Sequence, residues 1–126
     1  MCGIVGGFDL PQIEKGLNAI VHRGPDNQGI IQKDNVYFGH VRLSIIDTSS
    51  DSNQPFVYGN TTMVFNGTIW NYRELREELN IETKTSGDTE VLCAILDRYG
   101  IEGLNKVQGM FAVAFTQRDG SITIVR

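Results

Sequence analysis

The sequence predicts an α+β fold in which one antiparallel sheet packs on another and the helices lie outside. Three observations support this fold class. Residues 109–115 are apolar on both faces, as in a strand that is covered on both sides. Turn signals rich in Gly and Asn separate several other strand-like segments, and apolar residues recur at helical spacing elsewhere. A plain α+β sandwich with one helical layer is the alternative.

The first part of the chain is expected to form a strand, a helix and a hairpin. The glycines of the strand allow other backbone or a ligand to approach closely. Gly and Pro end the helix within His22–Asp26, and Asp34-Asn35 turns the hairpin. The expected elements are a strand over 2–8, a helix over 13–21, and hairpin strands over 29–33 and 36–46.

The middle of the chain should contain a polar loop, a strand and two helices. Asn66-Gly67 is a turn dipeptide that ends the strand, and Asn71 with Glu74 resembles a capping box at the start of the first helix. Gly100 ends the second helix, on which Cys93 lies away from the centre of the apolar stripe, as a packing or semi-exposed thiol. The expected elements are a loop over 47–53, a strand over 61–65, and helices from 71 and over 89–99.

The last part of the chain is expected to be a hairpin. Its first strand is the doubly apolar segment 109–115, Asp119-Gly120 forms the turn, and residues 121–126 return. There are no repeats or linkers, so residues 1–126 are expected to form one domain.

Composition limits the classes of function. The chain has 126 residues, 40% of them hydrophobic, which is enough for one core. A net charge of −4 without a basic cluster argues against nucleic-acid binding. No apolar run approaches the ~20 residues that span a bilayer, and the start does not resemble a signal peptide. Cys2 and Cys93 show no metal or disulfide spacing, so free thiols in the reducing cytoplasm, and no cofactor or metal, are expected.

Cys2 is the first candidate site residue. Removal of Met1 would leave a chain that begins with a thiol and a free α-amine on the same residue. The pKa of a terminal amine is about 7.7–8.0, so Cys2 could supply both nucleophile and base. The simpler interpretation is a small buried residue near a frayed end. Taken alone, Cys2 favours the simpler interpretation.

Other candidates lie where the expected strands end. Asn66-Gly67 could place a side-chain amide beside a backbone N–H and stabilise an oxyanion, or could simply be a turn. Arg42 lies in an apolar strand and needs an anionic partner, either a substrate carboxylate or, favoured by spacing, an internal Asp or Glu.

Asp88 could cap a helix or bind an ammonium group. The two histidines, His22 and His40, could be acid–base groups, although a loop residue making hydrogen bonds and a packed strand residue, respectively, are the simpler interpretations.

Together these residues form a known pattern. The chain resembles the class II glutamine amidotransferase domain, most closely that of glutamine-hydrolysing asparagine synthetase, from end to end. The matching segments are Met-Cys-Gly-Ile-Val-Gly at 1–6, His-Arg-Gly-Pro-Asp at 22–26, Gly-His-Val-Arg-Leu-Ser-Ile-Ile-Asp at 39–47, Gln-Pro at 54–55, Asn-Gly-Thr-Ile-Trp-Asn-Tyr-Arg-Glu-Leu at 66–75, Gly-Asp-Thr-Glu-Val at 87–91 and Gly-Met-Phe-Ala at 109–112.

The resemblance implies an N-terminal-nucleophile hydrolase with a four-layer αββα fold. Cys2 would attack the side-chain amide of glutamine while its own α-amine moves the proton. Asn66 and the Gly67 N–H would form the oxyanion hole. Arg42 would hold the α-carboxylate of glutamine and Asp88 its α-ammonium group.

The chain departs from the family in two ways. The family usually has Asn-Gly-Glu, whereas here Thr68 follows Asn66-Gly67 and carries no charge for the substrate ammonium. Weak binding of glutamine is therefore expected. Family members also continue past Arg126 with further strands and an ATP-binding synthetase domain. A synthetase domain or subunit, or self-association covering the incomplete sheet, is the expected partner.

The resemblance leaves three functions open. The chain could supply ammonia from glutamine to a synthetase, hydrolyse glutamine on its own, or be a non-catalytic remnant that binds glutamine or stabilises a partner.

Overall fold

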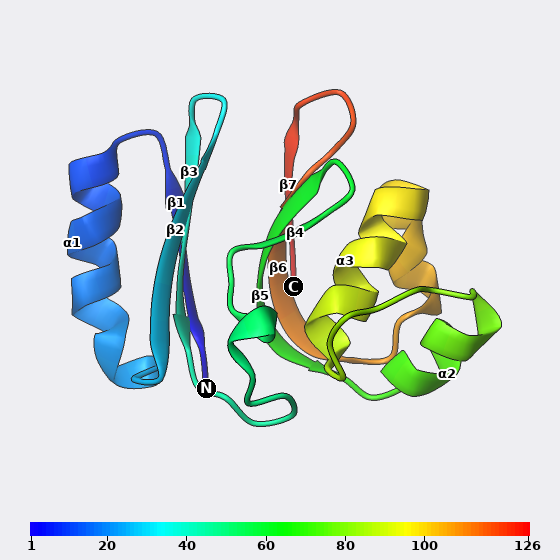
Figure 1. The fold of residues 1–126 in the computed structure, drawn as a ribbon. Helices are drawn as coiled ribbons and strands as arrows, with labels where there is room; N and C mark the ends of the chain where they lie inside the picture. Colours follow the sequence, from blue (N-terminus) through cyan, green and yellow to red (C-terminus); the bar gives the residue numbers. More distant parts are fainter.

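Two antiparallel sheets and three α-helices make up the fold in the computed structural model, which describes all residues 1–126. Figure 1 shows the two sheets facing each other, with α1 along the outer side of one and α3 and α2 beyond the other. The predicted α+β class with sheet on sheet is thus confirmed. None of the helices is long and apolar enough to span a bilayer.

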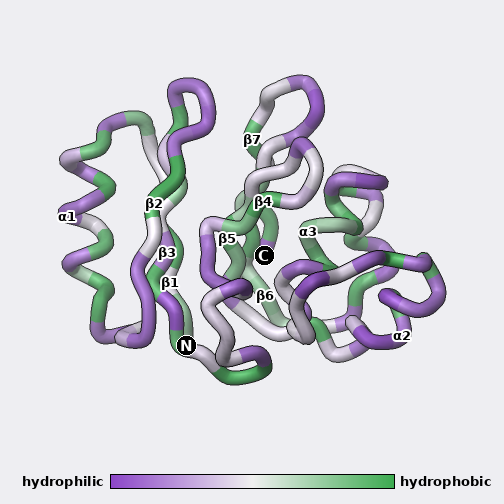
Figure 2. Tube along the Cα trace, in the orientation of Figure 1, coloured by the Kyte–Doolittle hydropathy of each residue, from purple (hydrophilic) through white to green (hydrophobic).

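The first sheet has the strand order β1-β3-β2 and carries α1 on one face. Pro11 at the start of α1 and the Asp9 side chain, which accepts a hydrogen bond from the Gln12 N–H, fix where this helix begins. In Figure 2 the tube of α1 alternates between hydrophobic and hydrophilic residues, as expected for a helix with one packed face. The elements are β1 (Gly3–Gly7), α1 (Leu10–Ile20), β2 (Asn27–Lys33) and β3 (Val36–Arg42).

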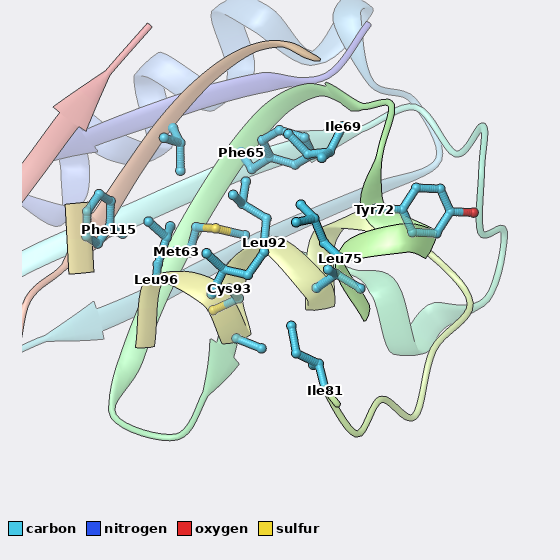
Figure 3. Packing of buried hydrophobic residues seen from close by; sticks show 14 residues of the cluster. Met63, Phe65, Ile69, Tyr72, Leu75, Ile81, Leu92, Cys93, Leu96 and Phe115 are labelled. Carbon is cyan, nitrogen blue, oxygen red and sulfur yellow. The ribbon is translucent and has the colours of Figure 1, made fainter. Parts of the chain in front are cut away.

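The second sheet has the strand order β4-β5-β6-β7 and is covered by α3. A cluster of 14 buried residues fills the space between this sheet and the helices, and Figure 3 shows Phe65 and Leu92 packed within it. The elements are β4 (Phe56–Tyr58), β5 (Thr61–Ile69), α2 (Tyr72–Glu78), α3 (Asp88–Tyr99), β6 (Gly109–Thr116) and β7 (Ile122–Val125). Short 3-10 helices lie at Val21–Arg23, Ser50–Ser52 and Gly100–Lys106.

Two predicted strand ends are wrong. The strand expected to reach residue 46 stops at Arg42, because β1 begins at Gly3, opposite Val41, and β2 begins at Asn27, opposite Arg42, so the following residues have no strand to pair with. Asn66-Gly67 is not a turn: β5 continues to Ile69, because β6 pairs with it along its whole second half. The short strand β4 has no counterpart in the sequence-based prediction.

The structure also differs from the prediction at two helix N-termini. The Asn71 side chain makes no capping hydrogen bond. It donates to the Lys106 carbonyl and accepts from the Gln108 N–H instead, which connects the start of α2 to the residues before β6. Gly87, not Asp88, is the N-cap residue of α3.

Cys93 is fully buried, because its side chain faces β4 and β5, where its Sγ donates to the Thr61 carbonyl at 3.7 Å. Burial raises the pKa of its thiol far above the ordinary value. Cys93 is therefore a packing residue and carries no reactive thiolate.

Candidate functional site

Strand alternation brings the candidate residues into the space between the two sheets. On β3, Phe38 packs between the sheets, so His40 and Arg42, which lie two and four residues further on, face the same way. On β5, Val64 packs between the sheets, and Asn66 and Thr68 follow with the same spacing. Both sheets therefore contribute to one site.

A cavity of about 420 Å³ opens at this end of the sandwich. All six residues proposed from the sequence line it: Cys2, Arg42, Asn66, Gly67, Thr68 and Asp88. They come from four segments that are far apart in the chain. His22 is exposed in the 3-10 helix at 21–23 and does not line this cavity.

Cys2 lies where β1 meets the end of β3. Gly3 pairs with Val41, so Cys2 is at the Arg42 end of the first sheet. Its Sγ accepts a hydrogen bond from the Leu43 N–H at 3.3 Å and lies 3.6 Å from the Leu43 carbonyl oxygen, so the backbone of Leu43 fixes the thiol in place. The Arg23 Nε donates to the Cys2 carbonyl at 3.1 Å and fixes the backbone of this residue. Sequence reasoning missed Arg23, because nothing in its spacing marks a contact with residue 2.

Arg42 is almost fully buried, but its partners are not the internal carboxylate favoured from the sequence. Nη1 donates to the Ser49 carbonyl at 2.6 Å and to Asn53 Oδ1 at 2.7 Å, and Nη2 donates to the Asp47 carbonyl. A guanidinium has five N–H groups, so the Nε–H and one Nη2–H remain without a protein acceptor. Free N–H groups of a guanidinium pair best with a carboxylate.

Gly67 is required by close packing of β5 against β6. A Cβ atom at this position would lie 2.2 Å from the Met110 carbonyl oxygen. Its partly buried neighbour Asn66 pairs with Ala112 on β6, and both Asn66 and Gly67 line the cavity. The side-chain amide and the adjacent backbone are thus presented by a rigid strand rather than by a turn.

Asp88 lies at the first position of α3 and is buried. Its Oδ2 accepts a hydrogen bond from the Ile69 N–H at 2.9 Å, which joins the helix start to the end of β5. Burial raises the pKa of Asp88 above the ordinary value, and the backbone N–H of Ile69 partly offsets this effect. An ammonium group that enters the cavity would stabilise the ionised form of this carboxylate.

Asp47 connects the two loops on either side of the cavity, a role that sequence reasoning missed. Its Oδ1 accepts from the Ser49 N–H at 2.8 Å and its Oδ2 from the Ser86 N–H at 2.9 Å. The loop that contacts Arg42 is thereby tied to the loop that leads into Asp88. These hydrogen bonds hold the pKa of Asp47 well below its usual range.

His40 is fully buried between the sheets, as expected for a packed strand residue. Burial, with a smaller contribution from the Arg42 charge, lowers its pKa to about 4. No group of three or more His, Cys, Asp or Glu side chains is close enough together to hold a metal ion.

Comparison with known proteins identifies the family. A family model described as a glutamine amidotransferase domain matches residues 1–126. The chain belongs to the glutamine amidotransferase family. The resemblance inferred from the sequence motifs is confirmed.

Similar proteins include several glutamine-hydrolysing asparagine synthetases. Asparagine synthetase 1 of Bacillus subtilis is 44% identical over 89% of this chain and 20% of its own length. Asparagine synthetase B of Escherichia coli is 38% identical over 90% of this chain and 23% of its own length. The putative asparagine synthetase 2 of Methanocaldococcus jannaschii is 35% identical over 97% of this chain and 29% of its own length. This amidotransferase chain thus spans less than a third of each of these relatives.

Proposed function

We propose that this chain hydrolyses the side-chain amide of glutamine and supplies the ammonia to a synthetase domain or subunit, in a reaction related to asparagine biosynthesis. The observation that carries the proposal is that Cys2 shares one cavity with Arg42, Asn66 and Asp88. Family membership and the names of the relatives agree with glutamine as the substrate. The two facing sheets with helices outside are compatible with the four-layer αββα fold of N-terminal-nucleophile hydrolases.

The reaction begins once Met1 has been removed. The Cys2 sulfur attacks the amide carbon of glutamine, and the carbonyl oxygen becomes an oxyanion that the Asn66 amide and the Gly67 N–H stabilise. The C–N bond then breaks, and the leaving nitrogen takes the thiol proton by way of the α-amine and departs as ammonia. Water attacks the resulting thioester, and glutamate leaves while the Cys2 thiol recovers its proton.

Binding of the substrate uses two charged side chains that line the cavity. The free N–H groups of the Arg42 guanidinium would donate hydrogen bonds to the α-carboxylate of glutamine. The Asp88 carboxylate would take the α-ammonium group, and the approach of that positive charge would lower its raised pKa. Thr68, exposed at the cavity, could contribute a neutral hydrogen bond to the same ammonium group.

The second candidate is a non-catalytic remnant that binds glutamine or stabilises a partner protein. Thr68 favours it, because the position carries no charge to help hold the substrate ammonium. Both candidates use the same cavity, so binding of glutamine does not separate them and turnover does.

The test is release of ammonia from glutamine by the purified protein, compared with a Cys2→Ala variant. The intact mass first establishes that Met1 is absent. Ammonia release that disappears in Cys2→Ala supports the enzyme. Binding of glutamine without turnover, measured by calorimetry on protein that lacks Met1, would instead establish the binding remnant. Co-purification of a synthetase with the native protein would support a coupled ammonia acceptor.

A further inference from the structure

The peptide group of Phe65 lies immediately before Asn66 and lacks a strand neighbour on one side. β4 pairs with β5 only from Thr61 to Met63, so this edge of β5 is open at Phe65. The Gln54 side chain occupies the place of a neighbouring strand. Its Oε1 accepts from the Phe65 N–H at 2.6 Å, and its Nε2 donates to the Phe65 carbonyl at 3.1 Å.

The same carbonyl also receives a hydrogen bond from the other sheet. His40 Nε2, on β3, lies 3.1 Å from the Phe65 oxygen. A carbonyl oxygen can only accept, so His40 carries its proton on Nε2, and its Nδ1 has no partner. Both His40 and Gln54 are buried, so the two hydrogen bonds are shielded from water.

The His40 bond spans the division between the two halves of the site, and the Gln54 bonds hold its acceptor in place. Cys2 and Arg42 belong to the first sheet, and Asn66 and Gly67 belong to the second. His40 lies two residues before Arg42, and the carbonyl it binds forms the peptide bond to Asn66. The distance from Cys2 to Asn66 and Gly67 thus depends on the hydrogen bonds that hold the backbone N–H and carbonyl of Phe65.

We propose that His40 and Gln54 are positioning residues, which hold the Phe65 peptide so that Asn66 and the Gly67 N–H face the oxyanion formed at Cys2. This inference rests on the proposed function for the role of Asn66 and Gly67. Neither side chain touches the substrate. The effect of either is transmitted through the Phe65 backbone.

Three variants test this role by kinetics. His40→Phe and Gln54→Met remove the hydrogen bonds while keeping buried side chains of similar size, and His40→Gln keeps a donor close to the position of Nε2. Loss of one oxyanion donor lowers kcat by about 10²–10³-fold. Partial misplacement in His40→Phe and Gln54→Met is therefore expected to lower kcat by about tenfold or more, with KM changed less than about twofold. His40→Gln should recover most of kcat.

Thr116→Val, on β6, is the matched control, because its hydrogen bond also reaches the backbone of β5. The Thr116 Oγ1 accepts a hydrogen bond from the Thr62 N–H at 2.9 Å, so this variant also removes a buried side-chain bond to the backbone of β5. The bond lies away from the cavity. Thr116→Val should lower stability and leave kcat unchanged. An equal fall of kcat in Thr116→Val, or a wild-type kcat in both His40→Phe and Gln54→Met, would overturn the proposal.

A second measurement does not depend on catalysis. The ¹H–¹⁵N spectra of the same variants report on the Asn66 and Gly67 backbone amides and on the Asn66 side-chain amide. His40→Phe and Gln54→Met should move these signals and speed hydrogen exchange at Phe65 or Gly67, whereas Thr116→Val should not. If wild-type protein lacking Met1 releases no ammonia, the proposed function fails, and this spectrum alone decides the positioning role. Unmoved Asn66 and Gly67 signals would refute it.

Discussion

Protonation of His40 in the unfolded chain should make the fold less stable as the pH falls from about 6.5 towards about 4. The pKa of His40 is about 4 in the folded chain and 6.5 in an exposed histidine. Between these values the unfolded chain binds a proton that the folded chain does not, so stability falls as the pH falls. At about pH 5 the difference amounts to roughly 2 kcal/mol relative to about pH 8, and the full loss below both pKa values is roughly 3 kcal/mol.

The measurement is the free energy of unfolding from urea titrations at about pH 8 and about pH 5, for wild type and His40→Gln. Other groups also titrate. The raised pKa of Asp88 works in the opposite direction, and the lowered pKa of Asp47 acts only at more acid pH. Subtracting the loss in His40→Gln from that in wild type isolates His40. An equal loss in both proteins would show that burial does not hold His40 neutral, and this reasoning would fail.

Three further predictions concern the cavity. Thr68→Glu should lower the KM for glutamine about ten- to over a hundredfold, because a charge-assisted hydrogen bond contributes about 1.5–3 kcal/mol; an unchanged KM would refute the role of Thr68. Gly67→Ala should lower both the melting temperature and kcat, since its Cβ would lie 2.2 Å from the Met110 carbonyl oxygen; wild-type values would show that β6 can move away. KM should rise as the pH falls through the raised pKa of Asp88, because the protonated acid cannot pair with an ammonium group, and a profile equally steep in Asp88→Asn would exclude Asp88 as the cause.

The elements that local signals define were predictable from the sequence. The turn at Asp34-Asn35 has Asp34 at φ 54°, and the turn at Asp119-Gly120 has Gly120 at φ 83°, as such dipeptides favour. The helix over 89–99 is one residue longer in the structure, because Gly87 rather than Asp88 caps it. In each case the information lies within a few residues of the element.

The failures share one physical cause, which is pairing between distant segments. Asn66-Gly67 has the composition of a turn, yet pairing with β6 overrides this preference and extends β5 to Ile69. The end of β3 at Arg42 is set by where its neighbours β1 and β2 begin, which local sequence does not encode. The bonds of Gln54 to Phe65 and of Arg23 to Cys2 likewise depend on how the chain folds back.

The candidate site residues were proposed from motifs, but their hydrogen-bond partners could not be. Arg42 illustrates the difference: the need for an acceptor followed from its place in an apolar strand, whereas the acceptors are two backbone carbonyls and an amide oxygen. Backbone carbonyls are present at every residue, so no sequence pattern marks the ones that a buried guanidinium will meet. Side-chain chemistry therefore predicts which residues need a partner, and only the fold specifies the partner.

The stability of this domain and the geometry of its site rest on different parts of the structure. The cluster between the second sheet and its helices holds 14 buried residues, whereas the cluster between the two sheets holds three: Phe38, Val64 and Ala114. Apolar burial contributes stability roughly in proportion to area, so the sheet–helix core resists unfolding while the sheet–sheet contact is comparatively thin. The proposed nucleophile, Cys2, and the proposed oxyanion donors, Asn66 and Gly67, line the cavity beside that thin contact. A directional bond such as that from His40 to Phe65 can therefore matter more for catalysis than its small share of the total stability indicates.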